Sequence, residues 1–391
     1  MRKLSADIIF PIAGSPIQEG VVVVDADGKI LQVDERKNHD PSSIEIYRGA
    51  IVPGFINTHC HLELSHMKGR VDTGTGLIPF IRSVVSFREV PMEEILTAIE
   101  KADQEMYDAG IVAVGDISNK LDTAATKARS PIRYYSFVEM FDFLQEANAD
   151  LAFQQYMEVY RGQADGAGNR KSCVPHAPYS VSKQLFHLIN EQNVPGSTVS
   201  IHNQETIHEN MLFLEKSGDL LDFYGGFNIP LDAFKPTGKK SINYALDHMD
   251  PNCRTLFVHN TMSDRLDIEA AQAWSPHTYW ATCANANLYI ENRLPNYQTF
   301  IDAGAKLTIG TDSLTSNWQL SVLEEMKTIA RYQSFIPLET LLRWATLNGA
   351  EALGFDDELG SLEVGKKPGL NLLSLEEDLK LRPQTQVSRL L

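Results

Sequence analysis

One stretch of the sequence decides the fold: Ile51-Val52-Pro53-Gly54-Phe55-Ile56-Asn57-Thr58-His59-Cys60-His61-Leu62. An apolar run that ends in polar residues is typical of a buried strand. Side chains on a strand alternate between its two faces, so we expect His59 and His61 to point the same way. Two imidazoles on one face at a strand end form half of a metal site. The pair is weak evidence by itself, and the rest of the chain has to supply the missing ligands.

Short apolar runs continue along the chain and alternate with helical patterns. The predicted strands are residues 52–59, 111–116, 132–139, 172–176, 198–202, 255–259, 278–283 and 306–312. Helical patterns between them include residues 93–109, 182–193, 264–274 and 320–332. Strands that alternate with helices of this length favour a parallel sheet. Eight such units predict the α/β class and a (β/α)8 TIM barrel.

The two ends of the chain have a different character. The runs Val21–Val24 and Lys29–Val33 flank Asp27-Gly28, which is a strong hairpin signal. Residues from Leu359 onward return to turns and short strands. We therefore expect residues 1–52 and 358–391 to form a small β-sandwich domain, and residues 53–357 to form the barrel.

Composition limits the classes of partner. A net charge of −16 argues against nucleic acids and anionic membranes, because nothing offsets the repulsion by phosphate. The four cysteines are scattered without a CxxC pair, so neither a disulfide framework nor a cysteine zinc module is expected. No run approaches the roughly 18 apolar residues that a membrane span needs. Free thiols and the lack of a signal-like N-terminus predict a cytoplasmic protein that acts on a small molecule.

Residues that can bind metal or transfer protons stand at the ends of several predicted strands. They are His59, His61, His202, His259 and Asp312. The carboxyl ends of barrel strands meet at one mouth, where active sites lie. Three imidazoles and a carboxylate around an open position suit catalytic zinc or iron. Each residue could instead be structural, as a core histidine or a helix cap, but all of them would then share one end of the barrel by coincidence.

Glu205 follows His202 by three residues, which places its carboxyl just beyond the strand end. A carboxyl beside a metal-bound water suits proton transfer. The alternative is a glutamate that compensates the dipole at a helix N-terminus.

These residues carry a resemblance to a known family. His59-Cys60-His61, the segment His202-Asn203-Gln204-Glu205-Thr206, His259 and Gly310-Thr311-Asp312-Ser313 resemble the signature of the amidohydrolase superfamily. The likeness is to its mononuclear deaminase and chlorohydrolase branch, which includes S-adenosylhomocysteine, methylthioadenosine, guanine and cytosine deaminases and the triazine hydrolases. It runs in order over essentially the whole chain.

The resemblance implies a cofactor and a set of roles. His59, His61, His202 and Asp312 would hold one divalent metal ion, with zinc ahead of iron. No lysine ends the predicted strand 172–176, where the binuclear branch carries a carboxylated lysine, and this favours one metal. Glu205, His259 and Asp312 would be catalytic: Asp312 takes a proton from water, His259 holds the nucleophile and Glu205 protonates the ring.

Finer features of the resemblance concern the substrate. Glu63, followed by Leu64-Ser65, looks like the aminodeoxyfutalosine deaminases, so we expect Glu63 to contact a ribose or a purine edge. His176 and Asn287 are the other expected substrate contacts. The alternatives are a solvated carboxylate for Glu63 and a proline-restrained loop around His176. Alanines replace the usual proline and serine of the loop that precedes Asn287, which leaves that loop's role open.

The expected function is hydrolytic deamination of an aminated heterocycle. The preferred substrate is a 6-aminopurine nucleoside, with aminodeoxyfutalosine first and methylthioadenosine or S-adenosylhomocysteine next. Guanine- or cytosine-type bases, ring opening as in imidazolonepropionases, and triazine dechlorination remain open. A scaffold without metal is disfavoured because all four ligands are present. Relatives are commonly dimers, so a homodimer is one expected assembly.

Overall fold

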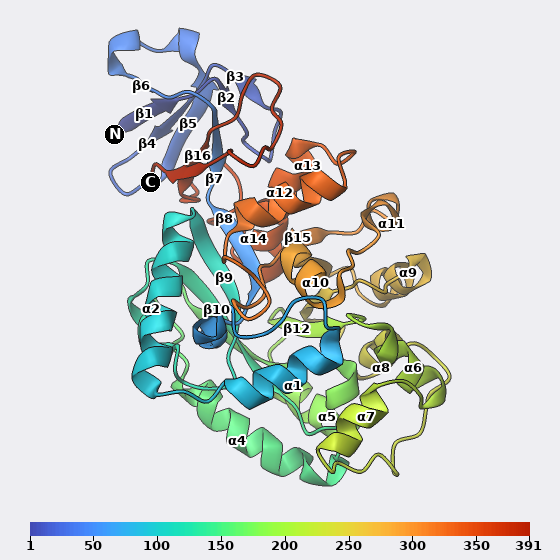
Figure 1. Ribbon diagram of the computed structural model, residues 1–391. Helices are drawn as coiled ribbons and strands as arrows, with labels where there is room; N and C mark the ends of the chain where they lie inside the picture. The colour runs from blue at the N-terminus through green and yellow to red at the C-terminus, as the bar shows by residue number, and fades with distance from the viewer.

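The computed structural model describes residues 1–391 and is a mixed α/β structure built around two parallel sheets (Figure 1). Both sheets have four strands, in the orders β11-β10-β9-β8 and β12-β13-β14-β15. Their bounds are β8 Phe55–Cys60, β9 Ile111–Ile117, β10 Arg133–Met140, β11 Arg170–Pro175, β12 Thr198–Asn203, β13 Arg254–His259, β14 Thr278–Thr282 and β15 Leu307–Ile309. Each of these strands overlaps one of the eight predicted from the sequence.

Hydrogen bonds join the edges of the two parallel sheets. At one edge the backbone N–H of His202 donates to the carbonyl of His176 at 2.9 Å. At the other edge the N–H of Thr311 donates to the carbonyl of His59 at 2.9 Å. The strands at both junctions end in the same direction, so the residues that follow them are brought together.

Helices follow the parallel strands, as the crossover connections of parallel sheets require. Their bounds are α1 Leu77–Phe87, α2 Met92–Asp108, α3 Ala124–Arg129, α4 Ala149–Gly162, α5 Lys183–Gln192, α6 Ile207–Glu215, α7 Leu220–Gly226, α8 Ser241–His248, α9 Arg265–Trp274, α10 Ala284–Glu291, α11 Tyr297–Asp302, α12 Val322–Tyr332, α13 Leu338–Ala345 and α14 Leu347–Leu353. The four helices predicted from the sequence correspond to α2, α5, α9 and α12. Their boundaries agree within two residues, because side-chain caps mark three of the starts: Ser182, Asp264 and Ser321.

Two further sheets form a β region from both ends of the chain, at the top of Figure 1. Their orders are β5-β4-β1-β6 and β17-β16-β7-β2-β3. The bounds are β1 Arg2–Ser5, β2 Ile8–Ile9, β3 Ile17–Gln18, β4 Gly20–Val24, β5 Ile30–Glu35, β6 Glu45–Ile46, β7 Ala50–Pro53, β16 Leu370–Leu373 and β17 Val387–Arg389. β16 pairs antiparallel with β7, so the tail pairs with N-terminal strands as expected. Leu4, Val22, Ile51 and Leu370 pack in a separate apolar cluster that draws on both sheets.

The first predicted strand, residues 52–59, is in fact divided between two sheets. β7 belongs to the terminal region and β8 begins the parallel sheets, with Gly54 between them. A Cβ atom at Gly54 would lie 2.3 Å from Val112 Cγ1 and 2.6 Å from the Pro368 carbonyl oxygen. Only glycine therefore fits at this junction. The prediction of one continuous strand was wrong because periodicity does not detect such a close approach.

The last predicted strand, residues 306–312, is shorter in the structure, since β15 ends at Ile309. Asp312 has a left-handed backbone with φ of 56°, which an extended strand does not contain.

The main apolar core includes Trp280, Phe137 and Phe257, all fully buried. Among the helices, none combines the length and the apolar character that crossing a membrane requires.

Asn371 links the terminal sheets to the parallel sheets. It is fully buried in β16, and its Nδ2 donates to the carbonyl of Gly110, just before β9, at 2.8 Å. The Gly110 carbonyl also accepts the N–H of Phe55 at 2.9 Å, so Asn371→Ala removes one of its two hydrogen bonds. We expect this loss to lower the free energy of unfolding by about 0.5–1.5 kcal/mol. Urea unfolding followed by circular dichroism measures the change. The exposed Asn38→Ala is the control, and equal stability of the two variants would show that the link contributes nothing.

Candidate metal and catalytic site

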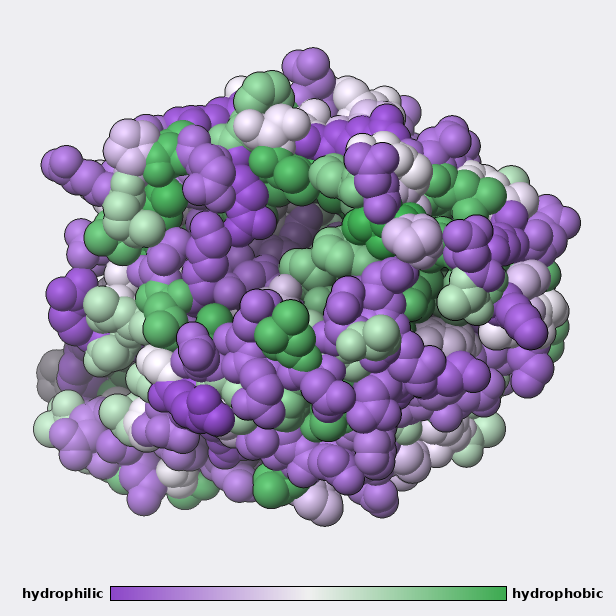
Figure 2. Space-filling model, turned by 90° about the horizontal axis from the view of Figure 1, so that it is seen from below, coloured by the Kyte–Doolittle hydropathy of each residue, from purple (hydrophilic) through white to green (hydrophobic).

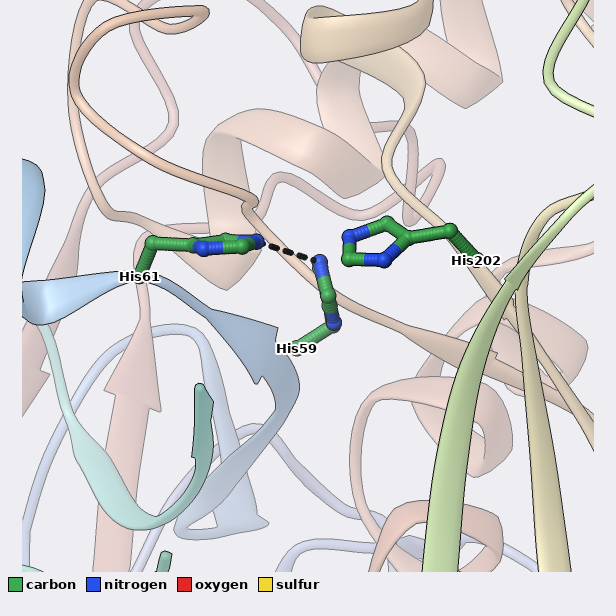
Figure 3. A group of neighbouring side chains, drawn as sticks. All are labelled: His59, His61 and His202. Carbon is green, nitrogen blue, oxygen red and sulfur yellow. Dashed lines mark hydrogen bonds between the residues drawn. The ribbon is translucent and has the colours of Figure 1, made fainter. Parts of the chain in front are cut away.

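The residues predicted from the strand ends converge in the structure. His59 is the penultimate residue of β8, His61 follows that strand, and His202 is the penultimate residue of β12. The three rings point toward one another in Figure 3, and the Nε2 atoms of His59 and His61 lie 3.2 Å apart. The centroid of the His202 ring lies 5.0 Å from that of His59 and 5.5 Å from that of His61. His59 and His202 are buried, and the side chain of His61 is 12% exposed.

Asp312 reaches the same point from the loop after β15. Its Oδ1 lies 3.3 Å from His61 Nε2 and 3.6 Å from His59 Nε2. Its Oδ2 accepts a hydrogen bond from the Ser316 hydroxyl. The left-handed backbone of Asp312 is uncommon for a residue other than glycine, and such conformations gather at functional sites.

Hydrogen bonds behind two of the imidazoles orient them. His202 Nδ1 lies 2.9 Å from the His176 carbonyl, to which it donates. His259, the last residue of β13, has its Nδ1 2.8 Å from Asn287 Oδ1. Each partner is an acceptor, so the proton lies on Nδ1 and the lone pair on Nε2. Partners of this kind fix the tautomer and direction of histidines that bind metals.

The donor set fits a divalent metal ion. Burial lowers the pKa of His59 and His202, and lowers that of His61 to about 4, so the rings are neutral near pH 7. Burial would raise the pKa of Asp312, but the neighbouring His59, His61 and His259 outweigh it and hold this pKa well below its usual range. Potential ligand atoms of His59, His61 and His202 lie within 4.8 Å of one another, as do those of His59, His259 and Asp312. Neutral imidazoles and an ionised carboxylate are the ligands that zinc and iron accept.

Glu205 lies beside this cluster, and its pKa is shifted in the opposite direction from that of Asp312. It is buried, and its Oε2 is 3.7 Å from His259 Nε2. Burial and, second, the charge of Asp312 raise its pKa well above the usual range. The raised pKa favours the protonated form of Glu205, which can donate a proton where Asp312 can accept one.

Sequence reasoning missed the residue that holds Glu205. Glu209, in the first turn of α6, accepts from the backbone N–H of Glu205 at 2.9 Å and from that of Gln204 at 3.0 Å. Gln204 has a left-handed backbone with φ of 46°. Glu209 itself is fully buried, and burial raises its pKa to about 8. The available signal was an acidic residue four positions after Glu205, which also reads as an ordinary helix N-terminal glutamate.

A buried ion pair behind the His59–His61 segment was also missed. Lys127 Nζ lies 2.5 Å from Asp116 Oδ2, and neither side chain is more than 2% exposed. Lys127 also donates to the hydroxyls of Ser118 and Ser136. The other oxygen of Asp116 accepts from the N–H of Leu62, the residue after His61, at 2.7 Å. The two charges are eleven positions apart, and no local pattern in the sequence indicates that they meet.

The three expected substrate contacts have different surroundings. Glu63 is buried, its Oε2 accepts from the N–H groups of Asn119 and Lys120, and burial raises its pKa to about 7. The His176 ring centroid lies 4.9 Å from that of His202. Asn287 is fully buried and its Oδ1 is bonded to His259. Asn287 is thus placed to orient His259, and the ring of His176 lies against that of His202. The hydrogen bonds of Glu63 go instead to the backbone after β9.

The face opposite the terminal sheets is hollowed, and hydrophilic residues form the floor of this hollow (Figure 2). β8 leaves the terminal region at Gly54 and runs away from it in Figure 1, so His59 and His61 stand at the end directed toward this face. The side chain of His61 is 12% exposed, so the cluster is not completely closed off from solvent.

Comparison with known proteins agrees with this geometry. The amidohydrolase family model matches residues 50–389. An adenosine deaminase of Helicobacter pylori is 27% identical over 84% of this chain and 79% of its own. An aminodeoxyfutalosine deaminase of a Nitratiruptor species is 26% identical over 87% of this chain and 81% of its own.

Solved structures share the fold. The crystal structure of Helicobacter pylori aminofutalosine deaminase in complex with methylthio-coformycin superposes with a TM-score of 0.81 at 23% identity, covering 96% of this chain and 93% of that one. An adenosine deaminase from Xanthomonas campestris with bound zinc superposes with a TM-score of 0.73 at 22% identity, covering 98% of this chain and 86% of that one. At these identities the likeness concerns the fold alone.

The ion pair beneath the cluster generates a prediction. Lys127→Met leaves Asp116 buried without a counter-ion, so we expect the free energy of unfolding to fall by about 3–5 kcal/mol. We also expect less bound metal per chain, because Asp116 holds the backbone after His61. Urea unfolding and mass-spectrometric metal analysis test the two effects.

The matched control is Lys101→Met, which removes a lysine from an exposed pair with Glu105. It should change neither quantity, because exposed ion pairs contribute little. Wild-type stability and full metal loading in Lys127→Met would show that the buried pair does not support the site.

Proposed function

The chain belongs to the amidohydrolase family, and on this premise we propose that it is a metal-dependent hydrolytic deaminase of an adenosine-type nucleoside. One observation carries the proposal: Glu205, a buried carboxyl whose pKa is raised, lies 3.7 Å from His259 beside a cluster of imidazoles that contains Asp312, a carboxyl whose pKa is lowered. This pairing supplies a proton donor and a proton acceptor in one small site. Hydrolysis of a carbon–nitrogen bond in an amidine needs both.

We further propose a closed architecture around this site. The hydrogen bonds that join both edges of the two parallel sheets support a (β/α)8 barrel over residues 53–357. The two terminal sheets and their shared apolar cluster support a β-sandwich of residues 1–52 and 358–391. In a barrel of this kind the strand ends that carry His59, His202, His259 and Asp312 surround one mouth.

The proposed cofactor is one divalent metal ion, zinc ahead of iron, held by His59, His61, His202 and Asp312. Bound there, such an ion supplies Lewis acidity and lowers the pKa of a water molecule toward neutrality. His202 is held in place for this role by the His176 carbonyl.

The residues around the ion carry the proton transfers. Asp312, ionised at neutral pH, accepts the proton of the attacking water. His259, held by Asn287, hydrogen-bonds and orients that water. Glu205 donates its proton to the ring nitrogen next to the carbon under attack. The exocyclic amino group then takes up the proton held by Asp312 and leaves as ammonia as the carbon–nitrogen bond breaks. The hydroxyl group on the same carbon gives its proton to Glu205, so both carboxyl groups return to their starting states and a ring lactam remains.

The preferred substrate is a 6-aminopurine nucleoside with an altered 5′ position. Aminodeoxyfutalosine comes first, and methylthioadenosine and S-adenosylhomocysteine come next. The names of the Nitratiruptor relative and of the superposed Helicobacter pylori structure support this order. Glu63, buried two residues after His61, and His176, whose ring lies against that of His202, are the proposed substrate contacts. Asn287 is proposed to act through His259.

Replacement of the proton donor tests the chemistry. In zinc-loaded protein, we expect Glu205→Gln to lower the rate of ammonia release by about 10²- to 10⁴-fold, because an amide cannot protonate the ring. Bound metal should stay at the wild-type level, since Glu205 is not one of the proposed ligands. An enzyme-coupled ammonia assay and metal analysis measure the two quantities.

Glu215→Gln, at the exposed end of α6, is the control and should keep full activity. Absence of ammonia release by the wild-type protein, loaded with zinc or iron, from every adenine nucleoside offered would overturn the proposed function. Release of chloride from a triazine in place of ammonia would also overturn it.

The support of Glu205 by Glu209 is tested separately. Glu209→Gln offers one acceptor oxygen to two backbone N–H groups, so one buried N–H loses its partner. We expect kcat to fall about 5- to 150-fold, as a loss of about 1–3 kcal/mol implies. KM and metal content should change less than about twofold. Steady-state kinetics measures kcat and KM separately, and an unchanged kcat would show that other contacts suffice to place Glu205.

A further inference from the structure

One buried glutamate connects two segments that carry or hold reactive residues. Glu325 lies in the first turn of α12 and is fully buried. Its Oε1 accepts a hydrogen bond from Asn317 Nδ2 at 2.8 Å, and its Oε2 accepts from the backbone N–H of Asn285 at 2.9 Å. Asn317 lies in the loop that follows β15, and Asn285 lies in the first turn of α10. The two oxygens of one carboxyl group thus hold two separate segments.

The first of these contacts reaches the backbone next to Asp312. Asn317 Nδ2 also donates to the carbonyl of Thr311 at 2.8 Å. Thr311 directly precedes Asp312, whose left-handed backbone is uncommon for a residue other than glycine. Such a conformation persists only where the surrounding structure fixes it. Glu325 and Asn317 fix it from the side of α12, whereas the carbonyl of His59 fixes it from the side of β8.

The second contact reaches the helix that orients His259. The first N–H groups of a helix need acceptors from outside it, and α10 has no side-chain cap from its own N-cap residue. Glu325 supplies an acceptor for the Asn285 N–H, and Thr328, one turn along α12, donates to Asn285 Oδ1. Asn287, two residues further along α10, bonds His259 Nδ1. The position of this imidazole therefore depends on where α12 holds the start of α10.

The neighbouring glutamate shows what an ordinary acidic residue at this helix start does. Glu324 is 38% exposed and pairs with Lys327 on the same helix. The cap of α12 is Ser321, whose side chain accepts from the Glu324 N–H. Glu325 has neither of these local tasks, because both its oxygens bond to other segments.

We propose that Glu325 is a positioning residue that sets Asp312 and His259 relative to each other, Asp312 through Asn317 and His259 through the start of α10. The roles of Asp312 and His259 rest on the proposed function, in which one accepts the proton of the attacking water and the other orients that water. A shared support keeps both groups directed at one point. Small displacements of reacting groups lower reaction rates by large factors.

Glu325→Ala removes both acceptors and tests this support. Two measurements report on the metal-binding cluster without turnover: the Kd for zinc, from competition with a chelator, and the visible absorption bands of the cobalt(II)-loaded chain. We expect the Kd for zinc to rise about 10- to 100-fold and the cobalt bands to shift, because loss of the partners behind metal ligands has effects of this size. In zinc-loaded protein, kcat should fall about 10- to 100-fold, with KM changed less than about twofold.

A second variant isolates the contact that leads to Asp312. Asn317→Ala removes the link to Thr311 and leaves the Asn285 contact in place, so it should raise the Kd for zinc by a similar factor. The double variant should bind zinc within about threefold of either single variant, because both changes break one network. Asn317→Ala alone tests this contact if Glu325→Ala does not fold.

The matched control is Asp103→Ala. Asp103 is a buried carboxyl that accepts from the hydroxyls of Tyr134 and Ser130, and Tyr134 lies at the start of β10, away from the strand ends that carry the cluster. Its replacement should lower the free energy of unfolding, because a buried hydroxyl loses its partner. It should leave the Kd for zinc, the cobalt bands and kcat unchanged.

The outcomes distinguish this support from the proposed reaction. An unchanged Kd for zinc, cobalt spectrum and kcat in Glu325→Ala overturn the support, as does an equal loss in Asp103→Ala. Effects of Glu325→Ala and Asn317→Ala that multiply in the double variant overturn the route through Asn317. Zinc binding that depends on Glu325, without ammonia release by the wild-type protein, retains the support of Asp312 and rejects the deaminase. Ammonia release that does not depend on Glu325 does the reverse.

Discussion

The backbone carbonyl of His59 accepts hydrogen bonds from the N–H groups of both Thr311 and Asp312. This joint ties the first parallel strand to the last, and it brings Asp312 against the two imidazoles of the first strand. It needs a left-handed backbone at Asp312 and no side chain at Gly310, where a Cβ would lie 2.8 Å from His59 Cβ. The site depends on this joint because its potential metal ligands come from the first parallel strand and from the loop after the last one.

Burial gives the groups at this joint opposite protonation states. Removal from water disfavours charge, so burial lowers the pKa of His59 and His202 and raises that of Glu205. Burial acts on Asp312 in the same way as on Glu205. The hydrogen bond from His59, and the charge that the imidazoles take up at low pH, outweigh it and hold the pKa of Asp312 well below its usual range. A set of chemically similar groups is thereby suited to the distinct roles proposed for it, as metal ligands, proton acceptor and proton donor.

A second layer of buried polar residues holds the reactive ones in place. Asn287 orients His259, Glu209 holds the backbone of Glu205, and the Lys127–Asp116 pair secures the residue after His61. Buried charges lower stability unless they are paired and fully hydrogen-bonded. Here they are paired, and they fix the positions of the residues around the cluster. Such positions matter because small displacements of reacting groups lower reaction rates by large factors.

The order of the helices and parallel strands could be predicted from the sequence alone, as could the meeting of His59, His61, His202, His259 and Asp312 at the strand ends. Strand alternation put His59 and His61 on one face, and the order of strands placed His202, His259 and Asp312 at matching ends, because these properties follow from local periodicity. The break at Gly54 and the partners Asn287, Lys127 and Asn119 became apparent only in three dimensions. These partners depend on contacts between residues far apart in the chain, or on different elements, which no local pattern records. The residues of the cluster could therefore be predicted from the sequence, whereas the residues that position them could not.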